Sequence, residues 1–290
     1  MLSVWIVWIR EPEPVPYQSW LLGCKIRKCG TSGGIKEEEI AMDYRYQDLS
    51  FVRKDHKKIV GRLYLPAEKG KYRTAIFAHG FNSHYGELEH YGPRFAKRGL
   101  AIVLFDFCGG GFNSKSDGDT TEMSVLTELE DYITVLRGIR ELEEIDAEQI
   151  YLMGESQGGY EAALAAARYP EESAGAILWY PAFCLEENAR KWCQDGVPKQ
   201  TDLWGVPLGR IYSEDAMRTD IYAEIADYHK QVLLIHGDQD DVVPLSYSKR
   251  AVETYPSAEL IIIPGGGHGF DGQDSVDAGN ASMDFIINHE

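Results

Sequence analysis

Residues that build metal sites and disulfide frameworks are scarce in this sequence. It has five cysteines and eight histidines among 290 residues, with no Cys-x-x-Cys pair and no histidine spaced as a metal ligand. An odd number of cysteines in a chain of this length does not indicate a disulfide framework. We therefore expect thiols, with a Cys184–Cys193 bridge as an alternative, and neither a metal nor another cofactor. The cysteines are Cys24, Cys29, Cys108, Cys184 and Cys193.

Basic residues are also few. Lys and Arg number 29 against 46 Asp and Glu, which gives a formal net charge of −17. Such a negative field repels a phosphate backbone. We therefore expect an acidic, soluble surface and no nucleic-acid partner.

No apolar run is long enough to cross a bilayer, which takes about 20 residues. The longest at the amino terminus, Met1–Ile9, ends at Arg10. Leu21–Cys24 is similar to a lipoprotein cleavage box, but Glu11 and Glu13 interrupt the apolar stretch that should precede it. We expect residues 1–35 to form an extension outside the fold, no membrane partner and a location in the cytoplasm.

From about residue 40 onward, apolar strands alternate with amphipathic helices. Two strands come first, separated by a charged turn, and they are expected to pair antiparallel. The later strands are short and apolar throughout, which is typical of parallel strands buried on both faces. This pattern predicts an α/β fold with a mostly parallel sheet flanked by helices. The predicted strands are 44–51, 58–65, 74–78, 100–105, 150–153, 176–179, 232–235 and 260–263, and the helices are 91–98, 124–139, 157–168, 246–255 and 275–288.

The alternation stops between Pro181 and Val232. About fifty residues without a strand are too many for a structureless loop in a compact domain, and this segment is rich in aromatic residues. We interpret residues 182–229 as a cap, or lid, inserted over the carboxyl ends of the strands. The core would then comprise residues 36–181 and 230–290.

A serine lies where a strand turns into a helix. Gly154-Glu155-Ser156-Gln157-Gly158 has the Gly-x-Ser-x-Gly pattern, with an apolar strand before it and an alanine-rich helix after it. A turn this tight requires glycines on both sides and exposes the serine hydroxyl. The pattern predicts Ser156 as a nucleophile.

A serine hydroxyl needs a base, and the base needs a carboxylate that orients it. His268 follows the last predicted strand and has glycines on both sides. Three aspartates follow the strand before it: Asp238, Asp240 and Asp241. We choose Asp240 among them. The order Ser156, Asp240, His268 is that of α/β-hydrolases.

An acyl-transfer intermediate also needs donors for its oxyanion. The backbone N–H of Gln157 is expected to be one, because it follows the nucleophile at a helix amino terminus. The other is expected from the loop after strand 74–78, and we choose Phe81. His79 in the same loop is interpreted as a structural residue.

Together these motifs resemble bacterial cinnamoyl/feruloyl esterases. The resemblance rests on His79-Gly80-Phe81, residues 105–111, 123–131 and 154–159, the Asp240 loop and Gly267-His268-Gly269-Phe270, and it covers residue 43 to the end. Two stretches depart from the pattern of these esterases. Glu155 stands where they often have histidine, and Gly110-Gly111-Phe112-Asn113 differs from their usual sequence at that place.

The resemblance implies a serine carboxylesterase that hydrolyses hydroxycinnamate esters, such as feruloyl or caffeoyl esters from plant cell-wall material. It assigns Ser156, Asp240 and His268 to the catalytic triad and Phe81 and Gln157 to the oxyanion hole. Aromatic residues in or near the cap are then expected to contact the phenyl ring: Trp179, Phe183, Trp192 and Trp204.

Other functions fit the same motifs. A short-chain acylesterase, a thioesterase or a peptidase-like hydrolase would use the same triad on another acyl group. A non-catalytic binding protein on this fold would be indicated by a missing triad residue, and none is missing here. The sequence leaves open whether the protein forms a homodimer.

Overall fold

The computed structural model describes residues 6–8 and 44–289 of the chain. They form a nine-stranded sheet in the order β1-β11-β10-β7-β6-β4-β5-β3-β2. The strands β2 and β3 pair antiparallel, as do β3 and β5, and every other pairing in this sheet is parallel. This confirms the predicted α/β fold. The strands are β1 (Ile6–Trp8), β2 (Tyr44–Val52), β3 (Lys58–Pro66), β4 (Tyr72–Ala78), β5 (Ala101–Phe105), β6 (Ile145–Glu155), β7 (Gly175–Trp179), β10 (Gln231–Gly237) and β11 (Ala258–Ile263).

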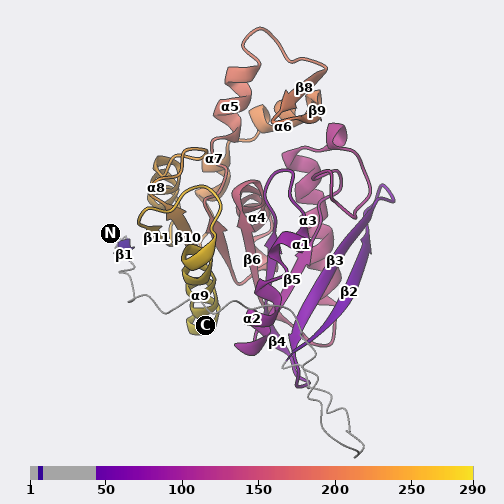
Figure 1. Cartoon of the computed structure of the whole chain (residues 1–290), viewed down its shortest axis with the longest axis vertical. Coiled ribbons are helices and arrows are strands. Elements are labelled where there is room, and N and C mark those ends of the chain that lie inside the picture. Colours follow the sequence, from indigo (N-terminus) through magenta and orange to yellow (C-terminus); the bar gives the residue numbers. More distant parts are fainter. Residues whose placement is uncertain (1–5, 9–43, 290) are drawn as a thin grey trace, which may run out of the picture.

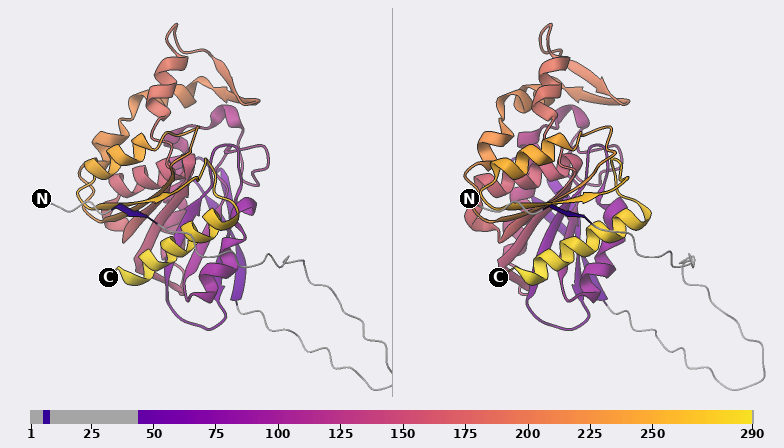
Figure 2. Two further views of the ribbon diagram at one scale, coloured as in Figure 1. Left: turned by 60° about the vertical axis from the view of Figure 1, so that its left-hand side comes forward. Right: turned by 90° about the vertical axis from the view of Figure 1, so that its left-hand side faces the viewer.

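Helices cover both faces of the sheet. Figure 2 shows α9 on one side and α8 on the other. Because side chains alternate along a strand, Ile76 and Ala78 of β4 face one layer while Ala75 and Phe77 face the other. The helices around the core are α1 (Tyr85–Leu88), α2 (Tyr91–Lys97), α3 (Val125–Arg140), α4 (Ser156–Arg168), α8 (Ser246–Thr254) and α9 (Gly272–Asn288), with the short 3₁₀ helices η1 (Thr120–Glu122) and η2 (Pro170–Glu172).

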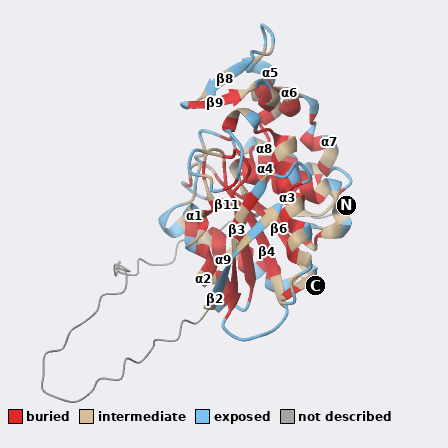
Figure 3. Ribbon diagram, turned by 90° about the vertical axis from the view of Figure 1, so that its right-hand side faces the viewer, coloured by how far each residue is buried: buried red, intermediate tan, exposed pale blue. Residues whose placement is uncertain are grey.

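The segment between β7 and β10 has secondary structure of its own. In Figure 1 it extends from the end of the sheet where β6 and β7 finish. In its outer hairpin strand β8, exposed residues alternate with partly buried ones (Figure 3), whereas Val206, Leu208 and Tyr212 join the main core. The elements are α5 (Leu185–Trp192), the antiparallel hairpin of β8 (Gln200–Leu203) and β9 (Val206–Gly209), α6 (Arg210–Arg218) and α7 (Ile221–Ile225).

Two expectations need correction. Ile6–Trp8 lies inside the segment that we expected outside the fold, yet it forms β1 and pairs with β11 at the edge of the sheet. The alternative of a Cys184–Cys193 bridge is wrong, because both residues are free thiols. The rest of the predicted extension, with Cys24 and Cys29, lies outside the described residues.

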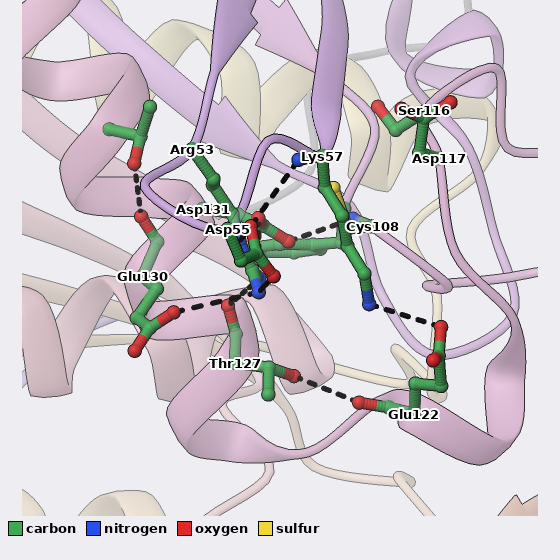
Figure 4. Close-up of polar contacts among 12 residues, drawn as sticks. Arg53, Asp55, Lys57, Cys108, Ser116, Asp117, Glu122, Thr127, Glu130 and Asp131 are labelled. Carbon is green, nitrogen blue, oxygen red and sulfur yellow. Dashed lines mark hydrogen bonds and ion pairs between the residues drawn. The ribbon is translucent and has the colours of Figure 1, made fainter.

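A buried ion pair attaches the β2–β3 turn to helix α3. Arg53 comes from the turn that we predicted only as charged, and its guanidinium lies 3.0 Å from the Asp131 carboxylate. Figure 4 shows Arg53 reaching toward α3, where it also donates to the Thr127 carbonyl oxygen at 3.1 Å. The second Asp131 oxygen accepts from the Cys108 backbone N–H at 2.7 Å. Buried hydrogen bonds to both carboxylate oxygens of Asp131 therefore hold helix α3 in place against the sheet.

Within the described residues, no helix is long and apolar enough to cross a membrane.

Candidate active site

Ser156 occupies the turn between β6 and α4 in a strained backbone conformation. Its φ is +51°, a left-handed value that costs free energy for a non-glycine residue. The turn is also too crowded for larger neighbours. A Cβ atom on Gly154 would lie 2.0 Å from the Gly158 carbonyl oxygen, and one on Gly158 would lie 2.4 Å from the Ala78 carbonyl oxygen. These clashes explain why glycines flank the serine.

The structure brings the three predicted triad residues together. The Nε2 atom of His268 lies 2.9 Å from the Ser156 Oγ, and its Nδ1 lies 2.8 Å from Oδ2 of Asp240. This is the arrangement in which histidine can take the serine proton while the carboxylate holds the imidazole in place. The residues come from the carboxyl ends of β6, β10 and β11 or from the loops that follow them.

The structure places Asp240, among the three aspartates, beside His268. Its Oδ1 accepts from the backbone N–H groups of Val242 and Val243. Burial alone would raise the pKa of Asp240, but hydrogen bonds from His236 and His268 outweigh it and hold that pKa well below its usual range. Asp240 is therefore a carboxylate at neutral pH. Asp238 instead accepts from the Gly265 backbone N–H at 2.7 Å and fixes the loop before His268.

The two expected oxyanion residues both adjoin Ser156. Gln157 belongs to the first turn of α4, where helix geometry leaves backbone N–H groups without an intrahelical acceptor. Phe81 follows β4 and lines both of the cavities that adjoin Ser156. Phe107 donates its backbone N–H to Nε2 of His79, whose Nδ1 therefore donates to the Gly80 carbonyl oxygen at 2.8 Å. His79 thus orders this loop.

Ser156 opens into two cavities. The cap cavity, of 230 Å³, lies under the inserted segment and has an apolar lining that includes Cys184, Leu185, Trp192 and Tyr212. The histidine-side cavity, of 530 Å³, is lined by His268 and by Glu87, Tyr91, Glu155, Tyr180 and Phe270. Phe81, Trp204 and Val242 line both cavities and divide them.

The expected ring-binding residues lie in different places. Trp204 is 73% exposed and lines both cavities, and Trp192 lines the cap cavity. The prediction is wrong for the other two. Trp179 is fully buried in the core and donates to Ser282 Oγ, and Phe183 packs between Tyr160 and Tyr222. Trp179 ends an apolar strand, so its burial follows from the same pattern that predicted the strand.

Sequence reasoning missed two polar side chains next to Ser156. Glu155 is in contact with the histidine-side cavity and accepts from the Tyr180 hydroxyl at 2.7 Å. Burial raises the pKa of Glu155. Tyr180 also packs edge-on against the His268 ring, with centroids 4.8 Å apart. Glu155 was visible in the sequence as a departure from the esterase pattern, whereas nothing singled out Tyr180.

No group of three or more His, Cys, Asp or Glu side chains in the described part of the chain is arranged to hold a metal ion.

The sheet order and the Ser156 turn define a serine hydrolase of the α/β-hydrolase class. The family model described as "Serine aminopeptidase, S33" matches residues 71–205, and the model described as "TAP-like protein" matches residues 214–286. A monoacylglycerol lipase from Mycolicibacterium smegmatis is 32% identical over 226 residues, which cover 66% of this chain and 79% of that protein. The chain belongs to the α/β-hydrolase family.

Two further proteins are similar to this chain, one in its sequence at lower identity and one in its solved structure. The mouse serine hydrolase BPHL is 23% identical over 59% of this chain, and the match spans 64% of the mouse protein. Est1E from Butyrivibrio proteoclasticus, whose structure was solved with ferulic acid bound, superposes with a TM-score of 0.76 and 26% identity. That superposition covers 82% of this chain and 98% of Est1E.

Proposed function

We propose that this chain is a carboxylesterase that hydrolyses hydroxycinnamate esters, of the feruloyl or caffeoyl type, through an acyl-enzyme on Ser156. The observation that carries the proposal is the position of Ser156 between two cavities, of which only the histidine-side cavity is lined by His268. The two halves of an ester substrate can then be assigned to the two cavities by the proton transfers that the reaction requires.

In the first half of the reaction, Ser156 Oγ attacks the ester carbonyl carbon as its proton passes to Nε2 of His268. The backbone N–H groups of Phe81 and Gln157 donate to the oxyanion of the tetrahedral intermediate. The C–O bond to the alcohol then breaks, and His268 gives the proton to the departing oxygen. Because the alcohol must reach His268, it occupies the histidine-side cavity, and the acyl group extends into the cap cavity. Water attacks the acyl-enzyme by the same route in reverse and releases the acid.

Aromatic side chains favour an aryl-acrylate acyl group in the cap cavity. The rings of Phe81 and Trp204 meet edge-to-face with centroids 5.9 Å apart, at the boundary beside Ser156. A flat conjugated acyl group can pack against such rings. The superposition with Est1E, solved with ferulic acid bound, supports the same acyl group.

An acylglycerol esterase is a second candidate. The identity with the mycobacterial monoacylglycerol lipase and the apolar lining of the cap cavity favour it. An aliphatic acyl chain would then take the place of the aryl-acrylate group.

A substrate panel tests these alternatives. We expect kcat/KM for methyl ferulate to exceed that for methyl esters of saturated acids of similar length. Efficient turnover of a monoacylglycerol or of p-nitrophenyl esters, with none of methyl ferulate, would exclude the hydroxycinnamate specificity. Ser156→Ala should reduce kcat by about 10⁴-fold or more on every substrate. Retention of full activity in that variant would exclude the mechanism.

A further inference from the structure

The Gln157 side chain is held from opposite sides by two buried residues on different elements. Its Nε2 donates to Oε2 of Glu128, on α3, at 2.6 Å. Its Oε1 accepts from the Tyr212 hydroxyl, on α6 of the cap, at 2.7 Å. All three side chains are buried. Hydrogen bonds of this length between buried groups are strong and directional.

The two partners hold the amide of Gln157 at both of its polar atoms. A phenol hydroxyl can donate to the amide oxygen, and the carboxyl of Glu128 can accept from the amide nitrogen. Rotation of the amide by 180° would require both partners to reverse their roles, with the hydroxyl accepting from the NH₂ group and a protonated Glu128 carboxyl donating to the amide oxygen. The two partners therefore fix the side-chain torsions of Gln157. They thereby also restrain the backbone of this residue, whose N–H is the expected oxyanion donor.

Both partners are themselves anchored. Helix α3 is held against the sheet by the Arg53–Asp131 pair. Helix α6 is tied to α3 because Ser124 Oγ, at the amino-terminal cap of α3, donates to Oδ2 of Asp215 at 2.7 Å. Tyr212 thus has a defined position relative to Glu128, although the two belong to different parts of the molecule.

The cap also contacts the other expected oxyanion residue. The Tyr212 and Trp204 rings lie 6.1 Å and 5.9 Å from the Phe81 ring, centroid to centroid. Tyr212 therefore contacts the side chains of both oxyanion residues, and any displacement of α6 would be transmitted to both.

We propose that Glu128 and Tyr212 are positioning residues for the oxyanion hole, so that the placement of cap helix α6 sets the geometry in which the Gln157 N–H meets the intermediate. This inference rests on the proposed mechanism, in which Ser156 forms an acyl-enzyme. Oxyanion donors act by being placed in advance at the distance that the developing charge requires. A shift of α6 away from α4 would relax that placement and slow the reaction without removing any catalytic group.

The test uses the full-length protein and p-nitrophenyl butyrate, with a boronic acid as a mimic of the tetrahedral intermediate. We expect Tyr212→Phe to lower kcat by about tenfold, a part of the 10²–10³-fold loss that removal of an oxyanion donor causes. KM should change by less than about twofold, and the boronic acid should bind more weakly by the factor lost in kcat. Glu128→Met should act in the same direction, and Glu128→Gln, which keeps an acceptor, should restore most of kcat.

Two further variants separate positioning from packing. Tyr222→Phe removes another cap hydroxyl, which donates to the Tyr247 carbonyl oxygen at 3.1 Å, and should leave kcat unchanged. Gln157→Leu keeps the backbone N–H but loses both side-chain hydrogen bonds. In that background Tyr212→Phe should have no further effect on kcat, because the hydroxyl acts through the amide.

Wild-type kcat in folded Tyr212→Phe and Glu128→Met proteins would overturn the proposal. The proposal would also be overturned if the losses in kcat caused by Tyr212→Phe and Gln157→Leu multiplied in the double variant, as independent effects do. A rise in KM with kcat unchanged in Tyr212→Phe would overturn it as well. If Glu128→Met fails to fold, Tyr212→Phe and the Gln157→Leu background decide the matter. Failure of the proposed function is distinct, since it would appear as a wild-type protein without esterase activity or as an active Ser156→Ala variant.

Discussion

The carboxylate of Asp240 lies between His236 and His268. Its Oδ2 is 3.2 Å from Nε2 of His236 and 2.8 Å from Nδ1 of His268. Nε2 of His236 also lies 2.8 Å from the Val243 carbonyl oxygen, which can only accept, so this nitrogen carries a hydrogen. Nδ1 of His236 faces the Ser248 hydroxyl at 2.7 Å. His236 is therefore a fixed donor that helps to hold Asp240 in the orientation that His268 requires.

Asp240→Asn should lower kcat by about 10⁴-fold, because the amide no longer holds the histidine in the productive tautomer. KM should change little, since Asp240 lies behind His268. The measurement is steady-state kinetics on any ester that the wild type hydrolyses. Asp238→Asn and Asp241→Asn are matched controls with the same change in charge. A comparable loss in either of them, with Asp240→Asn active, would show that the carboxylate had been wrongly chosen.

Trp204 should contribute to substrate binding far more than to stability. Its side chain is 73% exposed and lines both cavities beside Ser156. We expect Trp204→Ala to raise KM for an aryl-acrylate ester by about tenfold, which corresponds to about 1.4 kcal/mol, within the usual range for an aromatic contact. The melting temperature should stay within about 2 °C. Phe112→Ala, at a similarly exposed aromatic residue outside both cavities, serves as the control, and an equal effect there would contradict this role.

The side chain of Glu161 is expected to destabilise the folded protein. It is fully buried on α4, and neither of its carboxyl oxygens has a hydrogen-bond partner in the described structure. Burial raises its pKa well above the usual range. Because an unpaired buried polar group costs about 1–3 kcal/mol, Glu161→Met should raise the free energy of unfolding by that amount in urea denaturation. Glu161→Gln, which keeps two polar atoms there, should gain less. A loss of stability in Glu161→Met would show that the carboxyl is satisfied in solution.

The order of the elements and the triad could be predicted from the sequence because both depend on local signals. Short apolar runs mark the buried parallel strands, and glycines mark the turn at Ser156 and the loop around His268. Parallel strands end at the same edge of a sheet, so residues that follow β6, β10 and β11 come together without any knowledge of longer-range contacts. The antiparallel pair β2–β3 was predictable for the same reason, since only a short turn separates its strands.

The cap and the contacts around Gln157 could not be predicted in this way. The hairpin strands β8 and β9 have four residues each and are not continuously apolar, so they lack the signal that marks the equally short strands predicted in the core. Tyr212 and Gln157 are 55 positions apart and meet only once the cap has folded onto the core. The local sequence does not distinguish an exposed ring of this segment, such as Trp204, from a buried one, such as Phe183. Tertiary packing decides whether each ring is exposed or buried.

The stability of the protein should fall between about pH 5 and pH 8 because of Glu128. Burial raises the pKa of Glu128 to about 8, and the hydrogen bond from Gln157 only partly opposes this rise. In the unfolded chain the same group ionises with its usual pKa of 4.5. Between these values the folded protein binds a proton that the unfolded chain has lost, so the free energy of unfolding decreases as the pH rises.

Glu128→Gln removes this titration. The free energy of unfolding of the variant minus that of the wild type should therefore be larger at pH 8 than at pH 5, by about 2–4 kcal/mol. Urea denaturation of both proteins at pH 5, 6.5 and 8 measures the change. Glu130→Gln, at a mostly exposed residue on the same helix, should follow the wild type at every pH. If the wild type and Glu128→Gln lose stability in parallel, Glu128 does not hold its proton in the folded state, and its carboxyl must then be ionised where it meets the Gln157 amide.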